Sequence, residues 1–110
     1  MSKRSTDLLK GTLDLLILKT LELEPRHGVA IADRIAQITT GTFVVKPGSL
    51  FPALHRLEAE GYITGTWGET PEGRRAKVYT LSAAGRKQLG IEKRNWMKIT
   101  AAMGQVLESE

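Results

Sequence analysis

Apolar residues near the start of the chain recur at helical spacings and predict a helix over residues 5–24. They occupy two sides of this helix instead of a single stripe. One side carries Leu9, Leu13, Leu16 and Ile17, and the other carries Leu8, Leu15 and Leu18. A helix that is apolar on both sides is usually buried on both sides. In so small a protein, another subunit is one candidate for covering the second side.

A second helix is predicted over residues 28–40, and Gly41 is the expected residue just past its end. Its apolar positions at helical spacing are Ile31, Ile35 and Ile38. The stretch after it, residues 42–45, is rich in apolar residues and is expected to be extended. It leads directly into the next predicted helix.

The stretch KPGSLFPALHRLEAEGYI, residues 46–63, predicts a third and shorter helix. Pro47 fits the first helical position, where its missing amide hydrogen has no cost. Pro52 must lie near the helix start, because a proline deep in a helix costs about 3 kcal/mol. Gly61 is expected to end the helix. The inward-facing positions are Leu50, Leu54 and Leu57.

Two stretches rich in β-branched and aromatic residues, 62–67 and 76–81, predict strands. The stretch between them, residues 68–75, contains a proline and two glycines, which indicates a loop. The two strands are therefore expected to form a β-hairpin.

From Ser82 the pattern becomes helical again and stays so almost to the end of the chain. The apolar positions that follow a heptad-like spacing are Leu89, Trp96, Ile99, Met103 and Val106. A long helix cannot bury such a seam against itself. A neighbouring helix, often from a second chain, is the usual partner. The seam therefore predicts a homodimer, with Leu8, Leu9 and Leu13 of the first helix as further interface residues.

The predicted fold class follows from the order of these elements. The protein is expected to be mainly α-helical with a small β-hairpin. Three short helices followed by a two-stranded wing make a winged helix-turn-helix. We assign residues 1–81 to such a DNA-binding domain and residues 82–110 to a C-terminal dimerisation helix.

Composition narrows the possible functions. The chain has 110 residues, a formal net charge of +4, two histidines and no cysteine. It has no phosphate-binding loop and no metal-ligand spacing, so we expect no enzyme, no cofactor and no metal site. No stretch approaches the roughly 20 apolar residues of a membrane span, and the N-terminus lacks the pattern of a signal peptide. We expect a cytoplasmic protein with no membrane partner.

The third helix carries the first candidate chemistry. A helix start presents free amides and a positive dipole end to a phosphate. The candidate DNA-binding residues here are Lys46, Gly48, Ser49, His55 and Arg56. Ser49 can donate to a phosphate, and His55 and Arg56 could reach backbone or base edges in a major groove. The simpler alternative is an amphipathic surface helix with a solvated polar face.

The hairpin carries the second candidate chemistry. Arg74, Arg75 and Lys77 lie beside its loop and suit a DNA backbone or a minor groove. A basic edge that prevents pairing with other molecules is the simpler alternative. Two such features in this order favour DNA binding over both simpler interpretations.

Trp96 is a candidate for a small-molecule site. At a two-fold seam it would face its symmetry mate, and two indoles can stack on either side of a flat aromatic ligand. The alternative is that Trp96 simply fills the dimer core.

The chain resembles the PadR family of bacterial transcriptional regulators, in its short form. The resemblance covers nearly the whole chain and rests on LLKGTLDLLILKTL, HGVAIADRI, KPGSLFPALHRLEAEGYI, EGRRAKVYTLSAAGR and a tryptophan in the last helix. Three residues depart from the family pattern: Val29 and Phe51 stand where tyrosine is common, and Lys46 stands where a small capping residue is common. The loss of the hydroxyl at Phe51 affects only a local hydrogen bond.

The resemblance implies a homodimeric repressor on double-stranded DNA, with its third helix in the major groove. It also implies a small aromatic or hydrophobic effector, with Trp96 at the position of paired tryptophans. The expected function is therefore a DNA-binding transcriptional regulator that reads a near-palindromic operator. The alternative is a small-molecule-binding or protein-interaction dimer that uses a winged scaffold without DNA.

Overall fold

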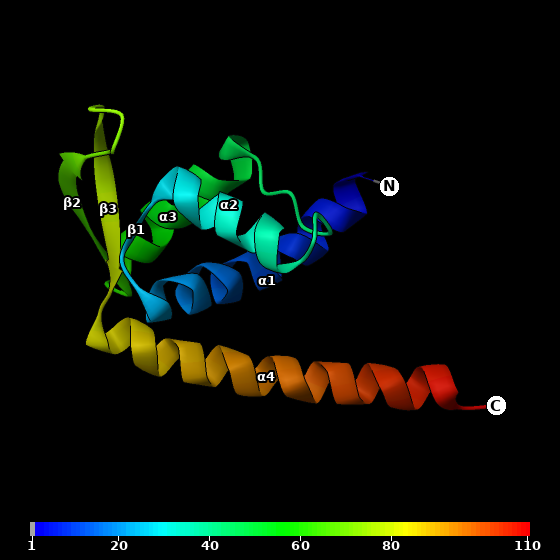
Figure 1. The fold of residues 1–110 in the computed structure, drawn as a ribbon. Coiled ribbons are helices and arrows are strands. Elements are labelled where there is room, and N and C mark those ends of the chain that lie inside the picture. The colour runs from blue at the N-terminus through cyan, green and yellow to red at the C-terminus, as the bar shows by residue number, and fades with distance from the viewer. Residues whose placement is uncertain (1) are drawn as a thin grey trace.

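The computed structural model describes the backbone of residues 2–110 and the side chains of residues 12–110. Figure 1 shows a helical body with a hairpin at one end and a long final helix that runs along one side of the body. The elements in chain order are α1 (Ser2–Leu23), β1 (Arg26–His27), α2 (Gly28–Ile38), α3 (Pro47–Ala59), β2 (Ile63–Glu69), β3 (Arg75–Leu81) and α4 (Ala83–Glu108). The predicted fold class, mainly helical with a small sheet, is confirmed.

Helix α1 is the central helix of the body. It lies between α4 on one side and α2 and α3 on the other. Ile17 and Leu18, on its two apolar sides, are both fully buried. At Ile17 and Leu18 the helix is thus covered on both sides by the chain itself, whereas Leu15 and Leu16 are only partly buried. Leu8 and Leu9 lie outside the described side chains.

Helix α2 ends earlier than predicted. The amide of Gly41 donates to the Ala36 carbonyl at 2.8 Å, and the amide of Thr40 donates to the Gln37 carbonyl at 3.3 Å. This pair of bonds is a Schellman motif, in which the residue just past the helix cap takes a left-handed conformation. Thr40 holds that position, with φ 52°, where Gly41 was expected. Of the three isoleucines at helical spacing, Ile31 and Ile35 are buried, whereas Ile38 in the last turn is exposed.

Helix α3 begins at Pro47, as predicted, and Lys46 is its N-cap without a side-chain cap bond. Its inward residues Leu50, Leu54 and Leu57 are buried in the core, which confirms the predicted inward face. The helix continues through Pro52. Because proline has no amide hydrogen, the Gly48 carbonyl lacks the backbone donor it would otherwise have at this point.

The sheet has three strands in the order β1-β3-β2, and both pairs are antiparallel. The hairpin of β2 and β3 was predicted, whereas β1 was not. Arg26 and His27 pair with Tyr79 and Val78 of β3. A two-residue strand has no periodicity to detect, and its pairing depends on a partner about fifty residues away along the chain.

Helix α4 begins where the sequence predicts. Ser82 is its N-cap and accepts a hydrogen bond from the Gly85 amide at 3.0 Å. The first part of α4 packs on α1, and the rest extends well beyond the body in Figure 1, which gives the molecule extents of 57 × 30 × 22 Å. In the described part of the chain, no helix combines the length and apolarity needed to cross a membrane.

Candidate nucleic-acid interface

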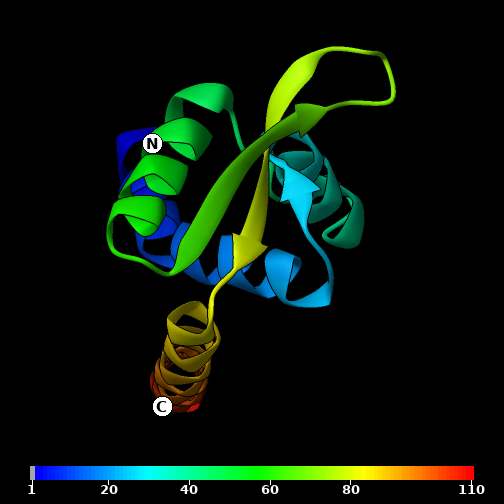
Figure 2. The same cartoon turned by 90° about the vertical axis from the view of Figure 1, so that its left-hand side faces the viewer.

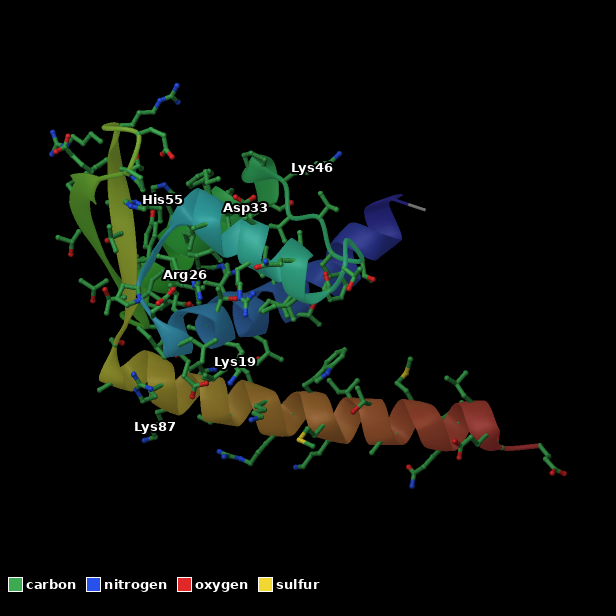
Figure 3. The ribbon with its side chains drawn as sticks, in the orientation of Figure 1. Lys19, Arg26, Asp33, Lys46, His55 and Lys87 are labelled. Carbon is green, nitrogen blue, oxygen red and sulfur yellow. The ribbon has the colours of Figure 1, made fainter. Side chains whose placement is uncertain are left out.

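Helix α3 and the hairpin stand together at one end of the body. Figure 2 shows them side by side above α4, which extends away below them. In Figure 3, Lys46 and His55 lie on the side of the body opposite α4, whereas Lys87 projects from α4 away from the body. The predicted DNA-binding residues of the helix and of the hairpin thus belong to neighbouring elements.

The start of α3 exposes Lys46, Gly48 and Ser49. It offers fewer amide donors than the sequence suggested. Pro47 has no amide hydrogen, and the amides of Ser49 and Leu50 both donate to the Lys46 carbonyl, at 3.0 and 2.9 Å. The Gly48 amide is therefore the donor that remains in this described turn, next to the positive end of the helix dipole. A Cβ at Gly48 would meet nothing within 4 Å, so the backbone is accessible there.

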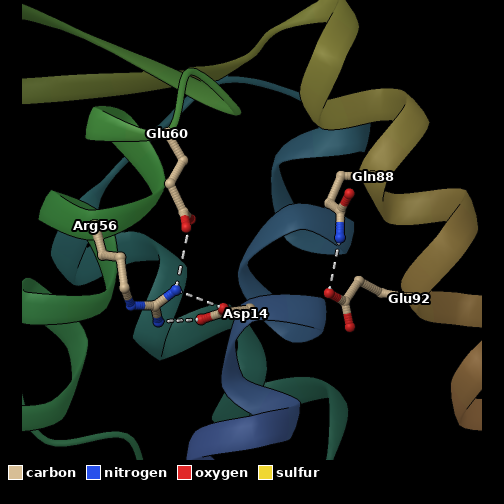
Figure 4. Close-up of polar contacts among 5 residues, drawn as sticks. All are labelled: Asp14, Arg56, Glu60, Gln88 and Glu92. Atoms are coloured by element: carbon tan, nitrogen blue, oxygen red, sulfur yellow. Dashed lines mark hydrogen bonds and ion pairs between the residues drawn. The ribbon is translucent and has the colours of Figure 1, made fainter.

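Arg56 is held by acidic residues of the same chain, as Figure 4 shows. Its Nη1 and Nη2 donate to the two carboxylate oxygens of Asp14 at 2.8 and 2.7 Å, and Glu60 Oε1 lies 3.7 Å from Nη1. The hydrogen bonds to Asp14 raise the pKa of Arg56 above its usual value, although desolvation opposes this shift. The guanidinium therefore ties α3 to α1. His55, its neighbour, is exposed.

The three cations of the hairpin differ in their surroundings. Lys77 Nζ lies 3.1 Å from Glu58 Oε1 and is only partly exposed. Arg75 lies over the Trp67 ring, 4.9 Å from its centroid. Arg74 is exposed at the loop, where its backbone amide donates to Thr70 Oγ1 at 3.1 Å. Among the described side chains, neither arginine forms an ion pair with a carboxylate.

The predicted dimer-interface residues fall into two groups. Leu13 and Leu89 belong to the core of the single chain, where they are 3% and 4% exposed. They have little surface left for a partner. The other described members lie along the exposed part of α4, and they are Trp96, Ile99, Met103 and Val106.

Sequence reasoning missed the carboxylates that hold the cations. Glu60 follows Arg56 by four residues on a predicted helix, and that spacing could have indicated an ion pair. Asp14 lies 42 residues before Arg56, so no local pattern connects the two. The sequence predicts Trp67 to lie in a strand, but its contact with Arg75 depends on how the two strands pair. The described residues include no cluster of three metal-ligating side chains.

Three helices followed by a hairpin, with exposed cations at the third helix and on the hairpin, define a winged-helix protein. The model of the transcriptional regulator PadR-like family matches residues 17–91. The chain belongs to this family. It is a transcriptional regulator and not an enzyme.

Solved structures and a curated relative agree with this family. The chain is 27% identical to a transcriptional regulator from Clostridium thermocellum, with a TM-score of 0.83, covering 90% of this chain and 96% of that one. It is 27% identical to a PadR-like transcriptional regulator from Bacillus cereus, with a TM-score of 0.80 and coverage of 94% and 99%. A transcriptional regulator of Mycobacterium tuberculosis is 42% identical over 50 residues, which are 46% of each chain.

Proposed function

We propose that the protein is a homodimeric repressor that binds a near-palindromic operator in double-stranded DNA. Residues 1–81 form the DNA-binding domain, in which α3 enters the major groove and the hairpin follows the flanking backbone. Residues 82–110 form the dimerisation helix. A regulator of this kind works in the cytoplasm, where its DNA is. The observation that carries the proposal is the gathering of α3 and the hairpin at one end, where Lys46, Arg74 and Arg75 form no ion pair with a carboxylate among the described side chains.

Each candidate residue has a proposed role. Lys46, Arg74 and Arg75 contact phosphates, because their charges have no carboxylate partner among the described side chains. The Gly48 amide and the Ser49 hydroxyl bind a phosphate at the helix start. His55 reaches base edges from the exposed side of α3. Lys77 and Arg56 are already paired with Glu58 and Asp14, so in this proposal they set the position of α3 and the hairpin.

The exposed apolar seam of α4 supports the dimer. Trp96, Ile99, Met103 and Val106 are between 40% and 71% exposed in the single chain. Contiguous apolar surface of this kind marks an interface. To read two half-sites one turn of the duplex apart, such a dimer must present its two copies of α3 about 34 Å apart. The same proposal includes a flat aromatic effector bound between the two Trp96 indoles. Quenching of Trp96 fluorescence by added flat aromatic compounds, measured in a Trp67→Phe background, checks this part.

Selection of bound sequences from a pool of random duplexes tests the function. We expect an inverted repeat whose half-sites are one helical turn apart. A selected sequence without two-fold symmetry would overturn the dimeric arrangement. Absence of any retained DNA at low salt would instead favour the alternative, a small-molecule-binding or protein-interaction dimer on a winged scaffold.

Replacing Arg74 with alanine is expected to weaken binding to the operator and to random DNA by the same factor. Each phosphate contact releases counterions, so the slope of log K against log salt should become less steep by about 0.9. Fluorescence anisotropy titrations at several salt concentrations measure both quantities. Lys87→Ala is the matched control, because Lys87 is an exposed cation that projects from α4 away from the body. A loss at Arg74 confined to the operator, with an unchanged slope, would contradict the phosphate role.

Two single variants, Arg56→Met and Asp14→Asn, distinguish whether Arg56 orients α3 or reads bases directly. If Arg56 orients α3 through Asp14, both variants should lower operator affinity by a similar factor, about fivefold for an ion pair worth roughly 1 kcal/mol. Affinity for random DNA should change less. Glu22→Gln, which removes the partner of Lys19 within α1, is the control. If only Arg56→Met loses discrimination, Arg56 reads bases directly.

A further inference from the structure

The hairpin exposes Trp67, a tryptophan that has no role in the function proposed above. Trp67 is 57% exposed, although a large aromatic side chain is usually buried. Two cations lie close to its indole ring: the Arg75 guanidinium at 4.9 Å and the Lys77 ammonium at 5.8 Å from the ring centroid. The hairpin thus carries one flat apolar surface that is directly bordered by positive charge.

Strand register places this surface on the side of the hairpin that faces α3. Side chains two residues apart along a strand share a face, so Ile63, Gly65 and Trp67 lie on one face of β2. Ile63 is buried in the core, and the Gly65 amide donates to Glu58 Oε2 of α3 at 3.3 Å. Trp67 is the next residue on that face, towards the hairpin loop. Lys77 is its direct partner on β3.

Glu58 fixes this face of the hairpin relative to α3. Its carboxylate holds the Lys77 ammonium at 3.1 and 3.4 Å and also accepts the Gly65 amide. The approach is close enough that any side chain at residue 65 would have to push its neighbours aside by a few tenths of an ångström. A Cβ at Gly65 would lie 3.0 Å from Glu58 Oε2 and 3.1 Å from Lys77 Cδ. These contacts connect α3, both strands of the hairpin and the cation beside Trp67.

We propose that Trp67 and Arg75 form a stacked surface that contacts the sugar–phosphate backbone of DNA just outside the half-site entered by α3, and that Glu58 is the positioning residue for this surface. The proposal rests on the proposed function, since it names a further part of the same DNA interface. Its occupant follows from charge and shape. The Arg75 guanidinium, which forms no ion pair among the described side chains, selects an anionic partner, and the indole offers an apolar face to a sugar ring.

The indole also prepares Arg75 for this contact. A guanidinium over an aromatic ring gains cation–π energy and gives up part of its rotamer freedom before DNA arrives. Its N–H donors remain available at the edge of the stack. Lys77 has a different role, because its charge is already matched by Glu58. It links the surface to α3.

The test compares two duplexes that contain the selected operator. One ends at the outer base pairs of the half-sites, and the other continues for about ten base pairs on each side. The wild-type protein is expected to bind the longer duplex about three- to tenfold more tightly. Trp67→Leu keeps every charge and should remove this preference while binding the short duplex normally. Trp67→Phe should restore part of it, because phenylalanine keeps an aromatic face.

Gly65→Ala tests the positioning role of Glu58 without changing any charge. It should displace the Glu58 carboxylate and reduce the preference for the longer duplex. Gly68→Ala is the matched control on the same strand, because its Cβ would meet only Val78 Cγ2 at an ordinary 3.6 Å. A further readout is the emission of Trp67 in a Trp96→Phe background, which should change when DNA is added.

The outcomes separate this inference from the proposed function. If the wild-type protein binds no duplex at low salt, the proposed function fails and this inference fails with it. If it binds but Trp67→Leu keeps the full preference for flanking DNA, only the Trp67 surface is overturned. If Gly65→Ala behaves like Gly68→Ala, the positioning role of Glu58 is overturned.

Discussion

Replacing Gly85 with alanine should be among the most destabilising single changes in this chain. Gly85 lies in the first turn of α4, where the helix passes directly against the backbone that precedes β2. A Cβ there would overlap the Tyr62 carbonyl oxygen and lie 2.7 Å from Leu81 Cδ1. The backbone oxygen cannot move aside as a flexible side chain could. We expect a loss of about 3 kcal/mol or more in the free energy of unfolding, and a Tm lower by roughly 10–20 °C.

The measurement is chemical and thermal unfolding at one fixed protein concentration, because dimerisation makes apparent stability depend on concentration. Gly90→Ala is the matched control in the same helix. A Cβ at Gly90 meets only Arg94 Nη1, at 3.5 Å. That variant should gain about 0.5–1 kcal/mol, since alanine is the better helix former. Equal stability of the Gly85 variant and the wild-type protein would contradict the close packing of α4 on Tyr62.

Met103→Glu should convert the proposed dimer into monomers and remove most of its operator affinity. Met103 is 58% exposed in the single chain, so the fold of each chain should survive the change. In the dimer, the new carboxylate would enter an apolar seam close to its own symmetry mate. Linking two half-site contacts typically adds a factor of 10²–10⁴ in affinity. We therefore expect operator affinity to fall by at least about 100-fold, with little change on random DNA.

Sedimentation equilibrium and operator titration measure the two parts of this prediction. Gln105→Glu adds the same charge about 200° further around α4, away from the seam. Gln105 is also exposed in the single chain, and its replacement should leave both the dimer and operator binding intact. A Met103→Glu protein that remains dimeric would move the subunit interface away from this seam.

Much of the fold could be predicted from the sequence. The three short helices, the hairpin and the long final helix were all expected from periodicity and turn residues. The errors lie where the determining contact is not local. Strand β1 exists because Arg26 and His27 meet β3. Helix α2 ends at Ile38 instead of residue 40, because Thr40, one residue before Gly41, takes the left-handed position just past the helix cap.

The sequence predicted which cations belong to the candidate site, but not which of them pair with carboxylates of other elements. Sequence reasoning grouped Arg74, Arg75 and Lys77 because they are neighbours in the chain. It could not separate Lys77, which Glu58 holds, from Arg74, which no carboxylate of the described side chains holds. Nor could it pair Arg56 with Asp14. Each of these distinctions depends on a carboxylate from another element.

The sequence by itself determined the four helices and the β2–β3 hairpin, although not the short strand β1, and that the chain belongs among small basic winged-helix proteins. These properties depend on side chains a few residues apart, so the chain carries them before it folds. Tertiary structure alone decided that Glu58 and Lys77 join α3 to the hairpin, and that Gly85 must remain a glycine. The physical reason is that the Glu58–Lys77 contact and the Gly85 site both join atoms from separate elements. Only the packing of those elements brings such atoms within van der Waals or hydrogen-bond distance.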